Sequence, residues 1–178
     1  ENLLSAVRHG ARAFNYCQVE EVVRGRLGID GLRVRDLLSN TVHKVRGRVI
    51  VNAAGPWVDR IRDLARIRDR GTRLIRTTKG IHCLLARMTD RAVYLSARDD
   101  RMIFMIPWRQ FSLVGTTDTD FDGNPDRLWA TRDEVLYLLG EIRRVFPDPR
   151  VTEGNVMYTY AGVRPLTFAA GKSASKVS

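Results

Sequence analysis

The chain has 178 residues, of which 44% are hydrophobic and 28% are charged, and this balance is ordinary for a globular protein. Its net charge is +10, but basic and acidic residues are interleaved, as in 60–63 and 66–70, which argues against a nucleic-acid interface. No apolar run approaches the roughly 18 residues of a membrane span, and no charged-then-apolar leader opens the sequence.

The first 51 residues are expected to form the end of a helix and then an antiparallel meander. Apolar residues fall at helical spacing between Leu3 and Ala11. Turn-forming residues at 27–31 and 39–40 then separate three stretches rich in strand-forming residues. The expected strands are Ala13 to Arg24, Leu32 to Leu38 and Val42 to Val51. The last of them ends in three apolar residues, 49–51, which predict a buried strand.

A short helix and a second region of strands are expected next. The helix is predicted from Pro56 to Ala65, because proline suits the first turn, where its missing N–H would lack a partner. The basic stretch from Arg66 to Arg76 is expected to connect into the second region. The strands predicted there are Arg73 to Arg76, Ile81 to Leu85, Ala92 to Ser96, Met102 to Ile106 and Ser112 to Gly115. Phe104, Ile106 and Trp108 are expected to lie in its core.

The clearest helix signal begins at Thr131. Thr131 and Glu134 form a capping box, in which each side chain satisfies a free backbone N–H of the first turn. The helix is expected to end before Pro147 and to bury one apolar stripe: Val135, Leu138, Leu139, Ile142 and Val145. A last strand is predicted from Val156 to Tyr160, and the small polar tail, 169–178, is expected to be loose.

Four short blocks carry candidate functional residues. They are Asn52-Ala53-Ala54-Gly55-Pro56-Trp57, Lys79-Gly80-Ile81-His82, Gly115-Thr116-Thr117-Asp118 and Gly162-Val163-Arg164-Pro165-Leu166. In the first block, small residues before a helix allow a ligand to approach the backbone, although a tight strand-to-helix turn has the same pattern. The third block is expected to end a strand and shape the site.

The other two blocks each offer a side chain suited to catalysis or binding. His82 can accept a proton near neutral pH, or it can be a histidine hydrogen-bonded within a sheet. Arg164 can hold an oxyanion with several fixed donors, or it can be a loop arginine paired with a nearby acid. Lys79 can attract an anion, or it can be a surface charge.

A run of alternating aspartates, Asp118, Asp120 and Asp122, imitates the start of a calcium-binding loop. Such a loop needs a bidentate carboxylate at its twelfth position, and here that position is Trp129. No metal site is therefore expected.

In this order and at this spacing, the four blocks resemble the middle of the FAD-dependent glycerol-3-phosphate dehydrogenases, a family of the D-amino-acid-oxidase-like flavoprotein superfamily. The resemblance extends roughly from Gly10 to Leu166. It implies a central fragment, since the G-x-G-x-x-G with which the family binds the ADP half of FAD does not occur near the start.

The resemblance implies an α+β fold, in which a substrate-binding region with an antiparallel β-sheet and flanking helices is attached to part of an FAD-binding domain. The expected boundaries are 1–66 for the part of the FAD-binding domain, 67–168 for the substrate-binding region and 169–178 for the tail. It also implies that Ala53, Ala54 and Gly55 lie against FAD.

The same resemblance implies a reaction and roles for two side chains. His82 would be the base or hydroxyl partner, and Arg164 would anchor the substrate and stabilise developing negative charge. Lys79 is included among the expected substrate contacts on its charge alone. The parent protein would oxidise sn-glycerol 3-phosphate to dihydroxyacetone phosphate, transfer a hydride to FAD and pass electrons to a quinone. It would be cytoplasmic, with possible peripheral contact with the inner face of the membrane.

Two other functions are compatible with parts of the sequence. A related flavoenzyme acting on an amino acid or a 2-hydroxy acid would share the fold and the first block, but Lys-Gly-x-His together with Gly-Val-Arg-Pro-Leu argues against it. A non-catalytic basic module that binds nucleic acid would show a salt-sensitive complex and no flavin spectrum.

Overall fold

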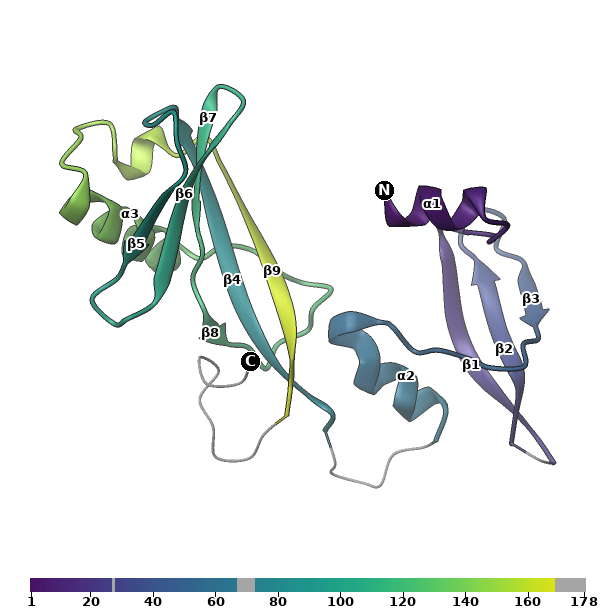
Figure 1. The fold of residues 1–178 in the computed structure, drawn as a ribbon. Coiled ribbons are helices and arrows are strands. Elements are labelled where there is room, and N and C mark those ends of the chain that lie inside the picture. The colour runs from purple at the N-terminus through teal and green to yellow at the C-terminus, as the bar shows by residue number, and fades with distance from the viewer. Residues whose placement is uncertain (27, 67–72, 169–178) are drawn as a thin grey trace. The chain divides into compact units, whose positions relative to one another are not determined.

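The computed structural model describes residues 1–26, 28–66 and 73–168 (Figure 1). Its backbone contacts divide the chain into two compact units. The first unit comprises Glu1–Ala54 and Val58–Thr72, and the second comprises Gly55–Trp57 and Arg73–Ser178. The expected loose tail and most of the expected basic connection lie outside the described residues.

The first unit contains the predicted helix end and antiparallel meander. Helix α1 spans Asn2–Arg8, and a three-stranded sheet follows in the order β1-β2-β3. Its strands are β1 (Cys17–Gly25), β2 (Gly28–Asp36) and β3 (Val42–Val45). Both pairings are antiparallel, so the meander is confirmed.

The prediction of a buried strand at 49–51 is wrong. Strand β3 ends at Val45, and the Val49 and Val51 side chains are 79% and 80% exposed. A strand needs a neighbour to satisfy its backbone N–H and C=O groups. Among the described residues no segment forms strand pairs with 49–51, so its apolar composition alone does not make a strand.

The predicted helix at 56–65 forms as two pieces. A 3₁₀ turn, η1 (Gly55–Trp57), places Pro56 at the start, and helix α2 follows at Val58–Leu64. Arg24 donates from Nε and a terminal nitrogen to the Ala65 carbonyl at 3.1 and 2.8 Å, so a strand β1 side chain caps the free end of α2. In the second unit, the Trp57 indole N–H donates to Asp126 at 2.9 Å.

The second unit is built around one long strand, β4 (Ile75–Ala86), which joins the two short strands expected at 73–76 and 81–85. The sheet order is β5-β6-β7-β4-β8, in which β7 and β8 pair with successive parts of one edge of β4. Strand β9 pairs with the opposite edge of β4 (Figure 1). The other strands are β5 (Val93–Ser96), β6 (Met102–Trp108), β7 (Phe111–Gly115), β8 (Thr119–Asp120) and β9 (Tyr158–Thr167).

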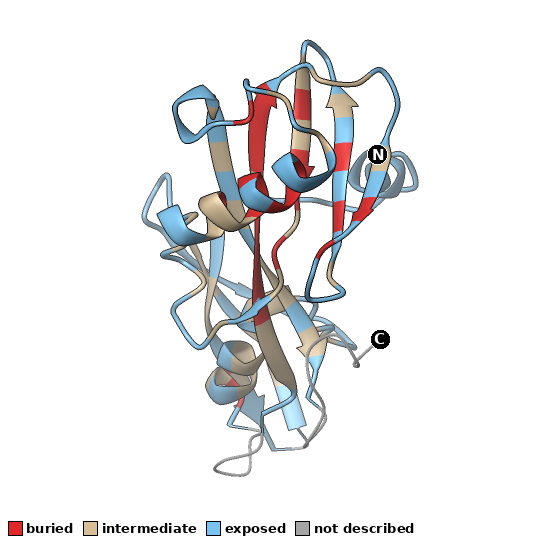
Figure 2. Ribbon diagram, turned by 90° about the vertical axis from the view of Figure 1, so that its left-hand side faces the viewer, coloured by how far each residue is buried: buried red, intermediate tan, exposed pale blue. Residues whose placement is uncertain are grey.

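Helix α3 (Arg132–Val145) covers one face of this sheet and forms the core with it (Figure 2). Its predicted capping box is confirmed: Thr131 Oγ1 accepts from the Glu134 backbone N–H at 3.4 Å, and the Glu134 carboxylate accepts from the Thr131 backbone N–H at 2.8 Å. A 3₁₀ turn, η2 (Glu153–Asn155), leads from α3 toward β9. The helix residues in the core are Val135, Leu138, Leu139 and Ile142, whereas Val145, at the end of α3, is 43% exposed, contrary to the prediction.

The aromatic end of β6 does not lie in the core, contrary to the prediction. Successive side chains of a strand point to opposite faces of the sheet. Ile103 and Met105 face α3 and are fully buried, so Phe104 and Trp108 face the other way and are 43% and 50% exposed. The part of the opposite sheet face that β6 forms is therefore apolar and accessible. No helix among the described residues is long and apolar enough to cross a membrane.

Candidate functional site

The pairing of β4 with β9 places two predicted site residues on the same face of the sheet. Strand β9 runs through the Gly162–Leu166 block, so Arg164 lies in a strand and not in the loop that one interpretation required. Arg164 is paired with Thr78, and His82 is paired with Tyr160. Paired residues share a face, and His82 and Thr78 are four residues apart on one strand. His82 and Arg164 therefore both face away from α3.

Arg164 is held by the loop that connects β7 to β8. Its guanidinium donates to Asp118 Oδ1 at 3.0 Å, to Thr116 Oγ1 at 3.0 Å and to the Thr117 carbonyl at 3.4 Å. Thr117 is itself anchored, because its hydroxyl accepts from the backbone N–H of Ile81 at 3.0 Å. Three consecutive residues thus fix one guanidinium, which keeps a side-chain exposure of 38%. Arg164 is therefore paired with an acid, Asp118, as the other interpretation expected, but the pair belongs to a set of contacts that fixes the guanidinium.

Two glycines make room for the functional side chains. A Cβ on Gly80 would lie 2.6 Å from an Arg164 terminal nitrogen and 2.4 Å from Thr116 Oγ1. A Cβ on Gly115 would lie 2.4 Å from a carbon of the His82 ring. The Arg164 guanidinium therefore extends over Gly80, two residues from His82 along β4, and the His82 ring lies over Gly115.

His82 is stacked and partly buried. Its ring lies parallel to that of Tyr160, with centroids 4.8 Å apart and planes 11° apart. Burial, and secondarily the positive charge of Arg164, lower the pKa of His82 below its ordinary value. The imidazole is therefore neutral near pH 7, and its unprotonated ring nitrogen can accept a proton.

A hollow of about 760 Å³ opens beside Arg164 on this part of the second unit. Its lining includes Arg164, Thr116 and the exposed ring of Phe104. His82 is not among the lining residues, but it packs over Gly115, the strand partner of Phe104. The lining is mainly charged, with three arginines and four aspartates beside the apolar side chains of Met102 and Phe104. Arg164 therefore offers fixed cationic donors at the edge of a polar hollow.

The alternating aspartates after β7 are partners of arginines. Asp118 pairs with Arg164, Asp120 pairs with Arg76, and Asp122 pairs with Arg73 at 3.3 Å. Among the described residues there is no cluster of three His, Cys, Asp or Glu side chains that could hold a metal ion.

Lys79 lies on the other face of β4. Its Nζ is 2.7 Å from Glu134 Oε2, and the two side chains are only 9% and 13% exposed. Burial raises the pKa of Glu134, but the hydrogen bonds from Lys79 and Thr131 lower it more, so the carboxylate stays charged. This placement does not support the substrate contact expected for Lys79, and it indicates a structural role between β4 and the start of α3.

Replacing Lys79 with methionine is expected to destabilise the protein by about 3 kcal/mol, because Glu134 would remain as a buried charge with only its Thr131 hydrogen bonds. Urea-induced unfolding measures this loss. The control Arg132→Met breaks the exposed pair with Glu153, which solvent screens, and should change stability little. A Lys79→Met protein with unchanged stability and weakened substrate binding would instead restore the role predicted from the sequence.

Ala53, Ala54 and Gly55 form a backbone segment with little side-chain bulk. The Asn52 side chain orders it by accepting from the Ala54 N–H at 3.2 Å and donating to the Val58 carbonyl at 3.0 Å. Gly55 has φ +52°, and a Cβ placed on it would meet nothing within 4 Å. The local backbone at Gly55 thus leaves room for a ligand to approach closely.

Replacing Gly115 with alanine is expected to cost about 1–3 kcal/mol of stability, since the new methyl group would overlap the His82 ring. Thermal or urea unfolding measures the loss. The matched control is Gly140→Ala on α3, where a Cβ meets nothing within 4 Å and helix propensity predicts a gain of up to about 1 kcal/mol. Equal effects of the two changes would contradict the contact between Gly115 and His82.

Almost the whole chain matches one family of known proteins. A family model described as FAD dependent oxidoreductase matches residues 2–174. The chain belongs to this FAD-dependent oxidoreductase family. The flavoprotein family predicted from the four blocks is therefore confirmed.

Two curated relatives of this FAD-dependent oxidoreductase chain are named aerobic glycerol-3-phosphate dehydrogenase. The protein of Staphylococcus aureus (strain USA300) is 35% identical over 185 residues, and that of Staphylococcus haemolyticus (strain JCSC1435) is 33% identical over 183 residues. Each match covers 100% of this chain and 32% of the relative. The chain thus spans about a third of the length of the curated relatives it matches.

Two solved structures share its fold. The glycerol-3-phosphate dehydrogenase from Bacillus halodurans, solved in complex with FAD, matches with a TM-score of 0.85 and 34% identity, covering 92% of this chain and 33% of that chain. The L-proline dehydrogenase from P. horikoshii matches with a TM-score of 0.69 over 92% of this chain and 41% of its own. At 16% identity the second likeness shows the fold alone. The predicted α+β class is confirmed.

Some residues of the candidate site were not assigned to it from the sequence of this FAD-dependent oxidoreductase chain. Tyr160 was seen only as part of a strand, and the hydrogen bonds from Arg164 to Thr116 were not anticipated. Gly115, at the end of a predicted strand, was one available indication, because glycine weakens a strand unless something approaches it closely. Gly80 lay between two predicted strands, and only the structure places it inside β4.

Proposed function

We propose that this chain is the central part of an FAD-dependent glycerol-3-phosphate dehydrogenase that oxidises sn-glycerol 3-phosphate to dihydroxyacetone phosphate. The observation that carries the proposal is the arrangement of His82 and Arg164 on one sheet face, each over a glycine and each held by neighbours. The names of the relatives that match the whole chain at 33–35% identity support the same substrate.

His82 and Arg164 have separate roles in the proposed reaction. Neutral His82 accepts the proton of the C2 hydroxyl through a ring nitrogen, since its pKa is lowered by burial and by Arg164. Arg164 holds the same oxygen as negative charge develops on it, and its own position is fixed before the substrate arrives. Bound FAD supplies the acceptor for the hydride.

The segment at 53–55 fits contact with FAD. Its side chains are no larger than a methyl group, and the backbone at Gly55 is open to at least 4 Å. We therefore assign Ala53, Ala54 and Gly55 to flavin contact within the proposal. An amino-acid or 2-hydroxy-acid oxidoreductase would need the same contact, so these residues do not decide the substrate.

A quinone is the proposed final electron acceptor, and the proposed location is the cytoplasm with peripheral contact with the inner face of the membrane. The net charge of +10 supports contact with an anionic lipid surface. Retention on vesicles that contain anionic lipid, and its loss at high salt, would test this part of the proposal separately from the chemistry.

The decisive experiment is anaerobic reduction of the flavin in the full-length protein. Addition of glycerol 3-phosphate should bleach the flavin absorbance, and equimolar dihydroxyacetone phosphate should form. Glycerol, 2-hydroxy acids and amino acids serve as controls. Bleaching by an amino acid or a hydroxy acid, and not by glycerol 3-phosphate, would replace the proposed substrate. A full-length protein without a flavin spectrum would overturn the proposal.

A further inference from the structure

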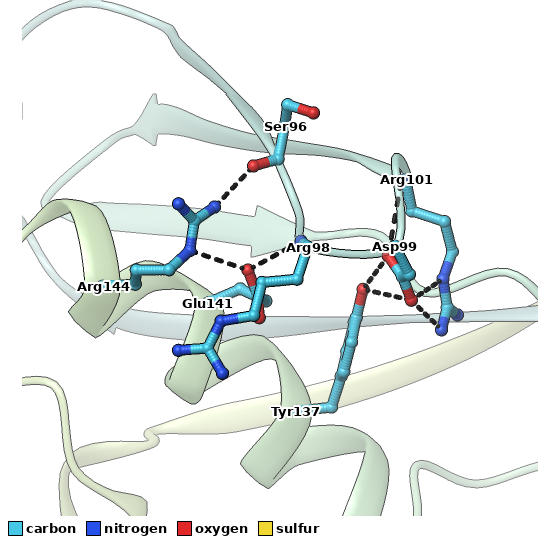
Figure 3. Close-up of polar contacts among 7 residues, drawn as sticks. All are labelled: Ser96, Arg98, Asp99, Arg101, Tyr137, Glu141 and Arg144. Atoms are coloured by element: carbon cyan, nitrogen blue, oxygen red, sulfur yellow. Dashed lines mark hydrogen bonds and ion pairs between the residues drawn. The ribbon is translucent and has the colours of Figure 1, made fainter.

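The turn between β5 and β6 is tied to α3 by a buried carboxylate (Figure 3). Glu141, with a side chain only 9% exposed, accepts from the backbone N–H of Arg98 at 3.2 Å and from Arg144 Nε at 3.1 Å. Arg144 also donates to the Ser96 carbonyl at 2.6 Å. This first anchor fixes the beginning of the turn.

A second anchor holds the middle of the turn. The Tyr137 hydroxyl on α3 lies 2.9 and 3.1 Å from the two carboxylate oxygens of Asp99 (Figure 3). Arg101 Nε donates to Asp99 Oδ2 at 2.7 Å, and its guanidinium lies 4.7 Å from the centroid of the Tyr137 ring. Burial, together with the hydrogen bond to Asp99, raises the pKa of Tyr137 to about 12, so the hydroxyl stays a donor.

Arg101 connects this anchored turn to the candidate site. One terminal nitrogen donates to the Asp118 backbone carbonyl at 3.2 Å. The carboxylate of the same Asp118 holds Arg164 at 3.0 Å. Arg101, Asp118 and Arg164 also line the same hollow. A continuous set of contacts therefore runs from α3 through the turn to Arg164.

We infer that Arg101 is a positioning residue, which sets the orientation of Arg164 by holding the backbone of Asp118. The inference rests on the proposed function for its kinetic consequence, but its geometric content is independent of the substrate. Two fixed acceptors, the Asp99 carboxylate and the Asp118 carbonyl, need two separated donors in one plane. A guanidinium offers them, whereas a lysine ammonium is a single point charge.

The kinetic test is a double-mutant cycle in the full-length flavoprotein. Arg101→Met should slow flavin reduction by glycerol 3-phosphate about 10- to 100-fold, because a small misplacement of a catalytic group has effects of this size. In an Arg164→Lys background the same change should slow reduction less than about 3-fold, since the residue that it positions is already altered. Arg101→Lys provides a second variant if the methionine variant does not fold.

The matched control is Arg144→Met. It breaks the first anchor of the same turn but leaves Asp99, Arg101 and Asp118 unchanged. It should lower thermal stability about as much as Arg101→Met, while flavin reduction changes less than about 3-fold. Equal kinetic effects of the two variants, or an Arg101 effect that is fully retained in the Arg164→Lys background, would overturn the inference.

A crystal structure of the Arg101→Met protein tests the geometry without turnover. The contact between Arg164 and Asp118 should be lost or moved, while α3 and its capping box stay in place. Retention of that contact would overturn the inference whatever the substrate is. If the wild-type flavin is not reduced by glycerol 3-phosphate, the proposed function fails, and this structure still decides the role of Arg101.

Discussion

Replacing His82 with alanine in the full-length protein should slow flavin reduction by glycerol 3-phosphate about 100- to 10,000-fold, which is the usual contribution of general base catalysis. Substrate binding should weaken much less, because the proposed role of the imidazole is to accept a proton and not to hold the substrate. The ring itself is positioned by stacking on Tyr160 and packing over Gly115. Anaerobic stopped-flow reduction over a range of substrate concentrations separates the two effects.

The control for this change is His43→Ala. His43 is an exposed histidine on β3, so its removal should leave the rate constant unchanged. A near wild-type rate in the His82→Ala protein would return His82 to the other interpretation, a histidine that only packs within the sheet.

The rate of flavin reduction should depend on pH through the protonation state of His82. Burial and the charge of Arg164 lower its pKa, so the base form persists to lower pH than for an ordinary histidine. The rate should fall as the pH drops through this lowered pKa, where the imidazole becomes protonated. In an Arg164→Met protein the repelling charge is absent, and the acid limb should move to higher pH. An acid limb at the same pH in both proteins would argue against proximity of the two groups.

Local features of the chain were predictable because short-range physics determines them. The capping box at Thr131 depends on residues three apart, and the stripe from Val135 to Ile142 follows from helix periodicity. The meander of the first unit follows from strand and turn composition. The prediction of a buried strand at 49–51 was wrong because a strand needs a partner strand, and local composition does not show whether one is present.

The candidate site depends on contacts between distant parts of the chain, which no local pattern reveals. Arg164 bonds to Thr116 and Asp118, which are 48 and 46 positions away in the sequence. These hydrogen bonds follow from the register of β9 on β4, which the sequence alone does not give. The face of Lys79 could have been deduced, because it is two residues from Ile81 and shares its side of the strand. The same alternation, applied to Ile103 and Phe104, would have placed the aromatic ring outside the core.

Replacing Arg164 with lysine in the full-length protein should slow flavin reduction about 30- to 1000-fold although the charge is retained. The guanidinium is held by Asp118 and Thr116 through separate nitrogens, and a lysine cannot reproduce this planar set of donors. Loss of one preorganised charge-assisted hydrogen bond to the reacting oxygen costs roughly 2–4 kcal/mol in the transition state. Stopped-flow kinetics and the affinity for dihydroxyacetone phosphate measure the effect, and Arg164→Ala should be at least as damaging.

The matched control for this change is Arg132→Lys. Arg132 also donates two hydrogen bonds to a carboxylate, that of Glu153, at 2.7 and 3.0 Å, but it is an exposed residue at the start of α3. Its replacement should leave the rate unchanged, because solvent screens the pair and, in the described part of the chain, Arg132 bonds to Glu153 and not to His82 or Arg164. If Arg164→Lys behaves like Arg132→Lys while folding normally, Arg164 serves only to join β9 to the β7–β8 loop. The proton transfer to His82 would then proceed without a fixed cation at the reacting oxygen, and the stabilising donor would have to come from another residue.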